Sequence, residues 1–238
     1  LAYETIGSDI TNWDVSNVTN MNRMFAYRLK FNQDISGWNV SRVKSMGSMF
    51  KYNEIFNQDI SGWDVDSVTN MSSMFRYADI FNQDLSGWNV SRVTNMDGMF
   101  ANTTDFNQYI GGWDVSSVNK MGGMFSNALS FNQDISSWDV SNVYSWEMDE
   151  MFDGALQFNQ DLSGWCVSQF EFAPSRFGNF GKDPVWGTCK PKIIRIAPQD
   201  SQMNVGLTPT FIWRSDSLYN YYHFEWMNSG LGDTLIHN

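Results

Sequence analysis

The sequence predicts a repeat solenoid followed by a short all-β segment. Tryptophan recurs every 25 residues from Trp13 to Trp138, and Trp165 follows after a step of 27. Phenylalanine and methionine recur with the same period through the same part of the chain. A fixed period of this length is typical of repeats that cannot bury their apolar face alone and therefore stack on one another.

Composition limits the function classes. The 238 residues include 15 Lys and Arg against 26 Asp and Glu, a net charge of −11, so a nucleic-acid backbone is not the expected partner. No apolar run reaches the roughly 18 residues of a membrane span. The two histidines are His223 and His237, so no Ser–His–Asp arrangement can form in the repeats, and we expect no enzyme here.

Residues 1–164 contain six repeats. In the unit at residues 31–55, the apolar residues neither alternate strictly nor keep a helical stripe. Short parallel strands are expected near Ile35–Val40 and Val43–Met46, with one helical or 3-10 turn at Met49–Asn53. The longer step before Trp165 places a two-residue insertion between Val143 and Met151, which is expected to bulge as a loop.

The aromatic and methionine columns are interpreted as the core, because every coil must fill the same cross-section. An exposed tryptophan column, which could instead stack against flat ligands, would form one long apolar patch. The Asn-Gln pairs that recur in each repeat, beginning with Asn32, are interpreted as a ladder of stacked amides.

An acidic column shares the period and consists of Asp9, Asp34, Asp59, Asp84, Asp134 and Asp161. A second column alternates Asp and Asn without a fixed pattern, which suits side chains that cap backbone N–H groups at corners. The alternative is calcium bound between coils by Asp34, Asp59 and Asp84, since adjacent carboxylates repel and calcium prefers oxygen ligands. The units lack the clustered spacing of a calcium loop. Otherwise no cofactor is expected.

A ligand is expected to bind where the repeats differ. After each Met–Phe pair, the first three units carry tyrosines and cations that share a register: Tyr27, Arg28, Lys30, Lys51, Tyr52, Arg76 and Tyr77. Stacked coils would align the tyrosines in a stripe edged by positive charge, and Tyr and Arg are favoured in binding hot spots. The alternative is an ordinary solvated corner of the rod.

At Cys166 the repeat pattern breaks. Residues 165–190 lose the Met–Phe pair and gain prolines, as expected of a cap that covers the last coil. A disulfide between Cys166 and Cys189 would fix this cap and indicate an oxidising compartment, whereas the alternative is two buried free thiols.

Residues 191–238 form a third region. The runs Ile193–Ile196, Thr210–Trp213 and Tyr221–Trp226 are β-rich and separated by turn residues, as in the opening strands of a β-sandwich. Because the chain starts within a degenerate repeat and stops within this region, we expect a piece of a longer chain with further domains.

The units FNQDISGWNVSRVKSMGSMF and FNQDLSGWNVSRVTNMDGMF closely resemble the bacterial surface-protein repeat called DUF285 or BspA-like, and WCVS…PVWGTC resembles that family's ending. The resemblance covers residues 1–190. It implies a leucine-rich-repeat-like solenoid on the bacterial surface or in the extracellular space. The expected role is adhesion to a protein or glycan of a cell surface or matrix; the alternative is a structural spacer. The string PQDSQMNVGLTPTFIW loosely resembles fibronectin type III or immunoglobulin-like modules.

Overall fold

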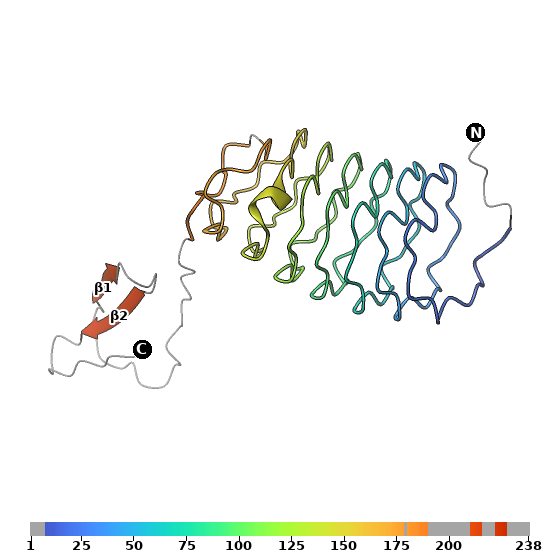
Figure 1. The fold of residues 1–238 in the computed structure, drawn as a ribbon, viewed down its shortest axis with the longest axis horizontal. Helices are drawn as coiled ribbons and strands as arrows, with labels where there is room; N and C mark the ends of the chain where they lie inside the picture. Colours follow the sequence, from blue (N-terminus) through green and yellow to red (C-terminus); the bar gives the residue numbers. More distant parts are fainter. Residues whose placement is uncertain (1–7, 179, 190–209, 216–221, 228–238) are drawn as a thin grey trace. The chain divides into compact units, whose positions relative to one another are not determined.

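The computed structural model of the chain describes residues 8–178, 180–189, 210–215 and 222–227. The chain divides into two compact units, of which the first ends at Cys189 and the second begins at Lys190. The first unit carries the repeats, and the second contains a pair of strands (Figure 1). Among the described residues, no helix is both long and apolar enough to cross a membrane.

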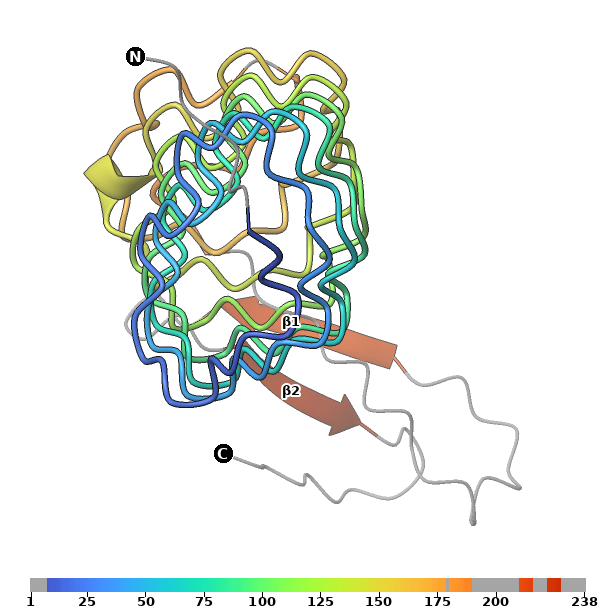
Figure 2. The same ribbon diagram turned by 90° about the vertical axis from the view of Figure 1, so that its right-hand side faces the viewer.

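In the first unit each repeat forms one coil, and successive coils stack on one another. Figure 2 shows them nearly superposed when the stack is seen from its end. Single-residue parallel bridges link Asn20, Ser45, Asn70, Asn95 and Lys120 of successive coils. Within residues 8–178 no extended strand forms, so the strands expected over 35–40 and 43–46 are reduced to one bridging residue in each coil.

Linked turns explain why the chain does not stay extended. In the second coil, the N–H groups of Met49, Lys51 and Asn53 donate to the carbonyl three residues earlier, at 3.0–3.2 Å. The N–H groups of Met46, Ser48, Phe50 and Tyr52 donate instead to the next coil, at 2.7–2.9 Å. Ser48 and Tyr52 adopt φ of 57° and 58°, which reverses the chain direction locally. These turns occupy the place of the helical turn expected at 49–53.

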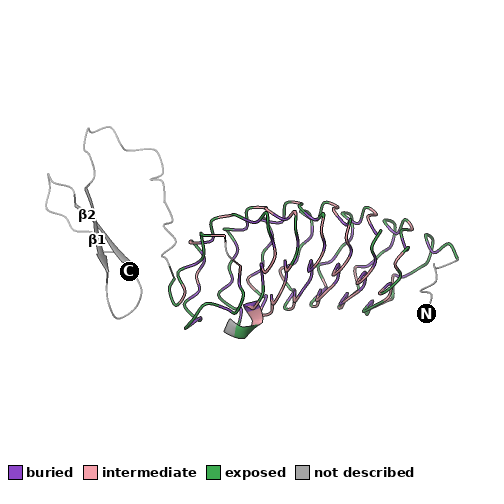
Figure 3. Cartoon of the chain, turned by 90° about the horizontal axis from the view of Figure 1, so that it is seen from above, coloured by how far each residue is buried: buried purple, intermediate pink, exposed green. Residues whose placement is uncertain are grey.

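The predicted core is confirmed. The tryptophans that recur with the repeat are at most 4% exposed, namely Trp38, Trp63, Trp88, Trp113, Trp138 and Trp165, and the phenylalanine and methionine columns are almost entirely buried. Buried positions recur from coil to coil along the stack (Figure 3). Phe50 stacks on Phe75 of the next coil with ring centroids 5.7 Å apart. Each of these tryptophans donates its Nε1–H to a carbonyl of the previous coil, as Trp63 does to Ile35 at 3.1 Å. The polar end of each ring therefore has a partner inside the core.

The insertion before Trp165 forms a short 3-10 helix rather than a plain loop. This helix, η1 (Ser145–Met148), projects from the side of the coil stack (Figure 2). The backbone of Glu147 and Asp149 still accepts the N–H groups of Met121 and Gly123, at 2.7 and 2.8 Å. The insertion therefore projects from the stack as η1, and the backbone hydrogen bonds between neighbouring coils are kept.

A disulfide joins Cys166 and Cys189, as predicted, within the segment that follows the last coil. Carbonyl groups of this segment accept hydrogen bonds from the preceding coil. The N–H of Glu150 donates to Ser175 and the N–H of Phe152 donates to Phe177, both at 2.8 Å. Phe177 and Phe180 pack edge-on against Phe152, at interplanar angles of 85° and 78°. Their edge-on packing ends the parallel stacking of the phenylalanine column, which suits a cap.

In the second unit, strands β1 (Thr210–Ser215) and β2 (Tyr222–Met227) form an antiparallel pair. Thr210 pairs with Met227 and Ser215 with Tyr222. Two of the predicted β-rich runs coincide with these strands, and the run at 193–196 lies outside the described residues. A sandwich that would include the pair stays a prediction.

Candidate binding site

The aspartate columns lie at the corners of the coils and cap backbone donors. The Oδ1 atoms of Asp34, Asp59 and Asp84 each accept the N–H group two residues later, at 2.8–2.9 Å. Asn39 and Asn89 of the second column make the same contact at 3.2 Å. A neutral amide can therefore replace the carboxylate, which matches the corner-capping interpretation.

These hydrogen bonds also lower the pKa values of the corner aspartates. The pKa of Asp34 and of Asp84 is lowered, first by the bond from the backbone N–H of the serine two residues later and then by its hydroxyl. The pKa of Asp59 is lowered chiefly by the hydroxyl of Ser61. Among the described residues, no group of three His, Cys, Asp or Glu side chains is close enough to hold a metal ion. Calcium at Asp34, Asp59 and Asp84 stays a hypothesis without support from this geometry.

The tyrosines of the variable segment form one continuous stack. The rings of Tyr27 and Tyr52 lie with centroids 4.8 Å apart, and those of Tyr52 and Tyr77 lie 4.4 Å apart at an interplanar angle of 7°. We call these three residues the tyrosine stack. Because both faces of the Tyr52 ring are covered by its neighbours, the middle of the stack offers ring edges and hydroxyls rather than flat faces.

Two of the predicted cations lie against rings of the tyrosine stack. Lys51 Nζ lies 5.6 Å from the ring centroid of Tyr52, and Arg76 Cζ lies 5.6 Å from that of Tyr77. Burial, reinforced by the charges of Arg76 and Arg23, lowers the pKa of Lys51. Arg28 and Lys30 are exposed in the first coil. The structure thus places Lys51 and Arg76 beside the rings of Tyr52 and Tyr77.

A hollow next to Tyr77 was not anticipated from the sequence. It measures about 420 Å³ and is lined by Tyr77, Asp79, Asn102, Thr104, Asn127 and Leu129. We call it the Tyr77 hollow. Asn102 and Asn127 occupy the register of the tyrosine stack in the next two coils. The change from Tyr to Asn at this register is the feature of the sequence that could have indicated the hollow.

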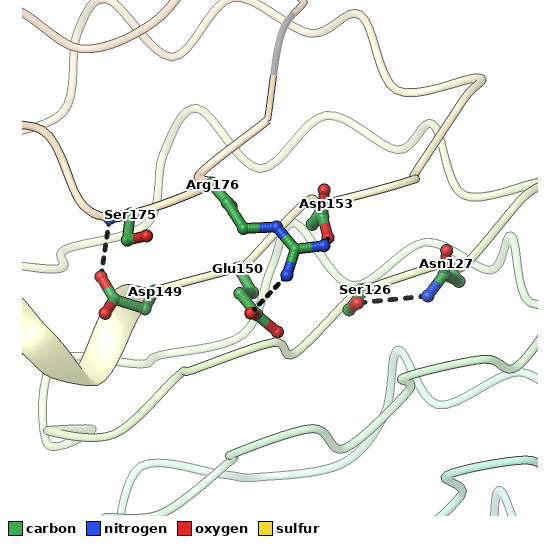
Figure 4. A network of polar contacts seen from close by, with 7 residues as sticks. All are labelled: Ser126, Asn127, Asp149, Glu150, Asp153, Ser175 and Arg176. Carbon is green, nitrogen blue, oxygen red and sulfur yellow. Dashed lines mark hydrogen bonds and ion pairs between the residues drawn. The ribbon is translucent and has the colours of Figure 1, made fainter.

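Near the cap, the flank that carries the tyrosine stack has hydrogen bonds and ion pairs between the cap and the last coil. Arg176 of the cap pairs with Glu150 at 2.9 Å and also with Asp153, while Asp149 accepts the N–H of Ser175 at 2.7 Å (Figure 4). Arg176 is well exposed, so these pairs stabilise the cap only slightly. The flank therefore changes from cationic and aromatic in the first coils to acidic near the cap.

These features define a class of protein: a stack of short coils with a nearly uniform core, corners capped by side chains, and one variable flank. The chain belongs to the family described as "Mycoplasma protein of unknown function, DUF285", whose model matches residues 2–105 and, in an overlapping second match, residues 81–182. This membership bears out the resemblance to the DUF285 repeat. No curated protein and no solved structure matches the chain.

Proposed function

We propose that this chain is an extracellular, non-catalytic binding module of the bacterial surface, which attaches to a protein or a glycan of a cell surface or matrix. Membership of the DUF285 family supports the repeat architecture on which this proposal depends. The disulfide between Cys166 and Cys189 supports an oxidising, extracytoplasmic location. Neither observation names the partner.

The tyrosine stack is the observation that carries the proposal. Tyr27 is 41% exposed, and Tyr52 and Tyr77 are half-buried, so a partner can reach all three while the stack stays ordered. Rigid aromatic side chains lose little conformational entropy on binding, and Lys51 and Arg76 add charged donors beside them. Such a surface suits recognition better than catalysis.

For the architecture, we propose a leucine-rich-repeat-like solenoid. The stacked coils and parallel bridges support this class, since each coil contacts its neighbours through equivalent residues. A solenoid of this kind presents its variable positions on one continuous surface, and the tyrosine stack occupies such positions.

The test replaces Tyr27, Tyr52 and Tyr77 together by Asn in the full chain. Asn is the matched choice, because Asn102 and Asn127 adopt the same positive φ at the same register. The wild-type chain and the triple variant are applied to an array of matrix proteins and glycans. We expect saturable binding by the wild type and at least about a tenfold loss in the variant, since hot-spot residues cost more than about 1 kcal/mol each on truncation.

The control is Tyr109→Asn, which removes an exposed tyrosine outside the stack. The control is expected to bind as the wild type does. Equal binding by the triple variant and the wild type, with both chains folded by circular dichroism, would remove the tyrosine stack from the proposal.

A structural spacer is the second candidate, and the regular bonding between coils favours it. From the first described coil onward, each coil donates up to four backbone N–H groups to the next, and the aromatic columns are continuous. A rod of this kind would resist bending and hold other domains apart. Absence of any saturable ligand for the folded chain would favour the spacer.

A further inference from the structure

The Tyr77 hollow exists because one side chain changes size at a fixed backbone position. Tyr77, Asn102 and Asn127 have φ of 61°, 58° and 55°, so the backbone of the three coils is equivalent here. Tyr52 covers one face of the Tyr77 ring at 4.4 Å. On the other side Asn102 stands where a fourth tyrosine would continue the stack, so among the described residues no further ring stacks on Tyr77, which lines the hollow there. The tyrosine stack therefore ends in an open aromatic platform.

Polar groups with spare hydrogen-bonding capacity surround this platform. Among the described residues, the side chains of Asp79, Asn102 and Thr104 make no hydrogen bond to any protein group, although all three are partly buried. Leu129 adds a partly exposed apolar side chain to the lining. A flat apolar face beside a carboxylate, an amide and a hydroxyl matches a ligand that has both C–H faces and hydroxyl groups.

We propose that the Tyr77 hollow binds one ring of a neutral carbohydrate, an inference that rests on the binding function proposed above. One pyranose ring would stack on the open face of Tyr77. Its hydroxyls would donate to the carboxylate of Asp79 and exchange hydrogen bonds with Asn102 and Thr104. The volume of about 420 Å³ is sufficient for a single sugar ring and part of its neighbour.

Charge selects against acidic sugars. Glu54 and Asp105 lie close enough to Asp79 that, together with burial as the larger cause, they raise its pKa. A sulfate, phosphate or uronate entering the hollow would meet this negative charge. Arg76, the cation beside the Tyr77 ring, lines a separate hollow together with Asp97, Asp149 and Glu150. The chemistry of the Tyr77 hollow therefore favours uncharged hexoses or pentoses.

The substitution Asn102→Tyr tests the inference by filling the hollow. A fourth tyrosine would continue the tyrosine stack in a backbone conformation that Tyr77 already tolerates, so the variant is expected to fold. The probes are cellohexaose, xylohexaose, mannohexaose and chitohexaose, with a heparin hexasaccharide as the charged comparison. Binding to the full chain is measured by calorimetry and by saturation-transfer NMR. We expect at least one neutral probe to bind and Asn102→Tyr to weaken it at least about tenfold.

Two control variants sharpen this result. Tyr77→Phe keeps the aromatic face and is expected to retain the affinity within about twofold, whereas Tyr77→Asn removes the platform and is expected to weaken binding as Asn102→Tyr does. Binding of a neutral probe that is unchanged in Asn102→Tyr would overturn the site. Matrix proteins or heparin that bind while every neutral probe fails would overturn the inference and leave the proposed function standing. Failure of all ligands would overturn both.

Discussion

The buried tryptophans show how one residue type meets two demands in every coil. Each of the six repeat tryptophans (Trp38, Trp63, Trp88, Trp113, Trp138 and Trp165) fills the core, and each Nε1–H donates to a carbonyl of the preceding coil. Trp88, for example, is 3% exposed and donates to Ile60 at 3.1 Å. A tryptophan at this position therefore contributes both apolar burial and a hydrogen bond between coils.

Replacing Trp88 by Phe is expected to lower the free energy of unfolding by about 2 kcal/mol. The change removes a buried hydrogen bond and part of a filled volume. Urea unfolding measures the loss. Trp13→Phe is the matched control, because Trp13 is 51% exposed and its replacement should change the free energy by less than about 0.5 kcal/mol. Similar losses in both variants would contradict the role given to the buried ring.

The corner aspartates predict a loss of stability in acid. The pKa values of Asp34, Asp59 and Asp84 in the folded chain lie below the ordinary value of 3.8. Their contribution is thus present above pH 3.8 and is lost as pH falls below it. Asp79 and Asp97 act in the opposite direction, since burial raises their pKa values.

Thermal melts from about pH 5 to pH 2 test this balance. The triple variant Asp34→Asn, Asp59→Asn, Asp84→Asn is expected to keep the corner bonds, as Asn39 and Asn89 do, and to lose less stability in acid than the wild type. If the triple variant and the wild type lost the same stability in acid, groups other than these three aspartates would be responsible for the acid sensitivity. An increase in melting temperature with calcium that the triple variant lacks would restore the metal hypothesis.

At the scale of the structural elements, linked turns take the place of strands. These turns require a residue with positive φ at a fixed position in each coil. Gly123 occupies this position with φ of 56°, and Ser48 and Ser73 occupy it in other coils, also with positive φ. A Cβ atom added to Gly123 would meet nothing closer than 3.7 Å, so space does not oppose a larger residue there. The backbone conformation alone favours glycine.

Gly123→Ala is therefore expected to destabilise the chain by about 1 kcal/mol through backbone strain. Gly87→Ala is the control, because a Cβ at Gly87 meets no atom within 4 Å and its φ is not in the positive range. This control should be neutral or stabilising by up to about 1 kcal/mol. Thermal unfolding of both variants decides the matter, and a destabilising Gly87→Ala would contradict the assignment of strain to φ.

The core residues and the corner aspartates could be predicted from the sequence, but the turns between them could not. The period of Trp and Phe fixes which residues meet in the core, and Asp followed by Ser marks a corner by local hydrogen bonding. The backbone bonds at Ser48 and Tyr52 join residues 24 positions apart, and no local propensity reports them. For the same reason the strands expected at 35–40 and 43–46 were too long.

The candidate site was predictable in part. The shared register of Tyr27, Tyr52 and Tyr77 in the sequence indicates the tyrosine stack. The covering of ring faces within the stack, and the open face beside Asn102, depend on ring spacing and side-chain size in three dimensions.

At the scale of the whole first unit, the disulfide stabilises the end of the stack. Replacing Cys166 and Cys189 by Ser is expected to cost about 3 kcal/mol, because the bond closes a loop of about 24 residues in the unfolded chain. Unfolding in urea with and without reductant measures this cost. Reductant should destabilise the wild type and leave the double variant unchanged; an unchanged wild type would show that the bond contributes nothing to the cap.

The claim that the variable flank binds a partner is tested most directly by one comparison on a single array of glycans and matrix proteins. The wild-type chain and the triple variant of Tyr27, Tyr52 and Tyr77 to Asn are measured side by side at equal, verified foldedness. The account predicts a saturable signal for the wild type that falls at least about tenfold in the variant. Equal signals, or no saturable signal from the folded wild type, would contradict it.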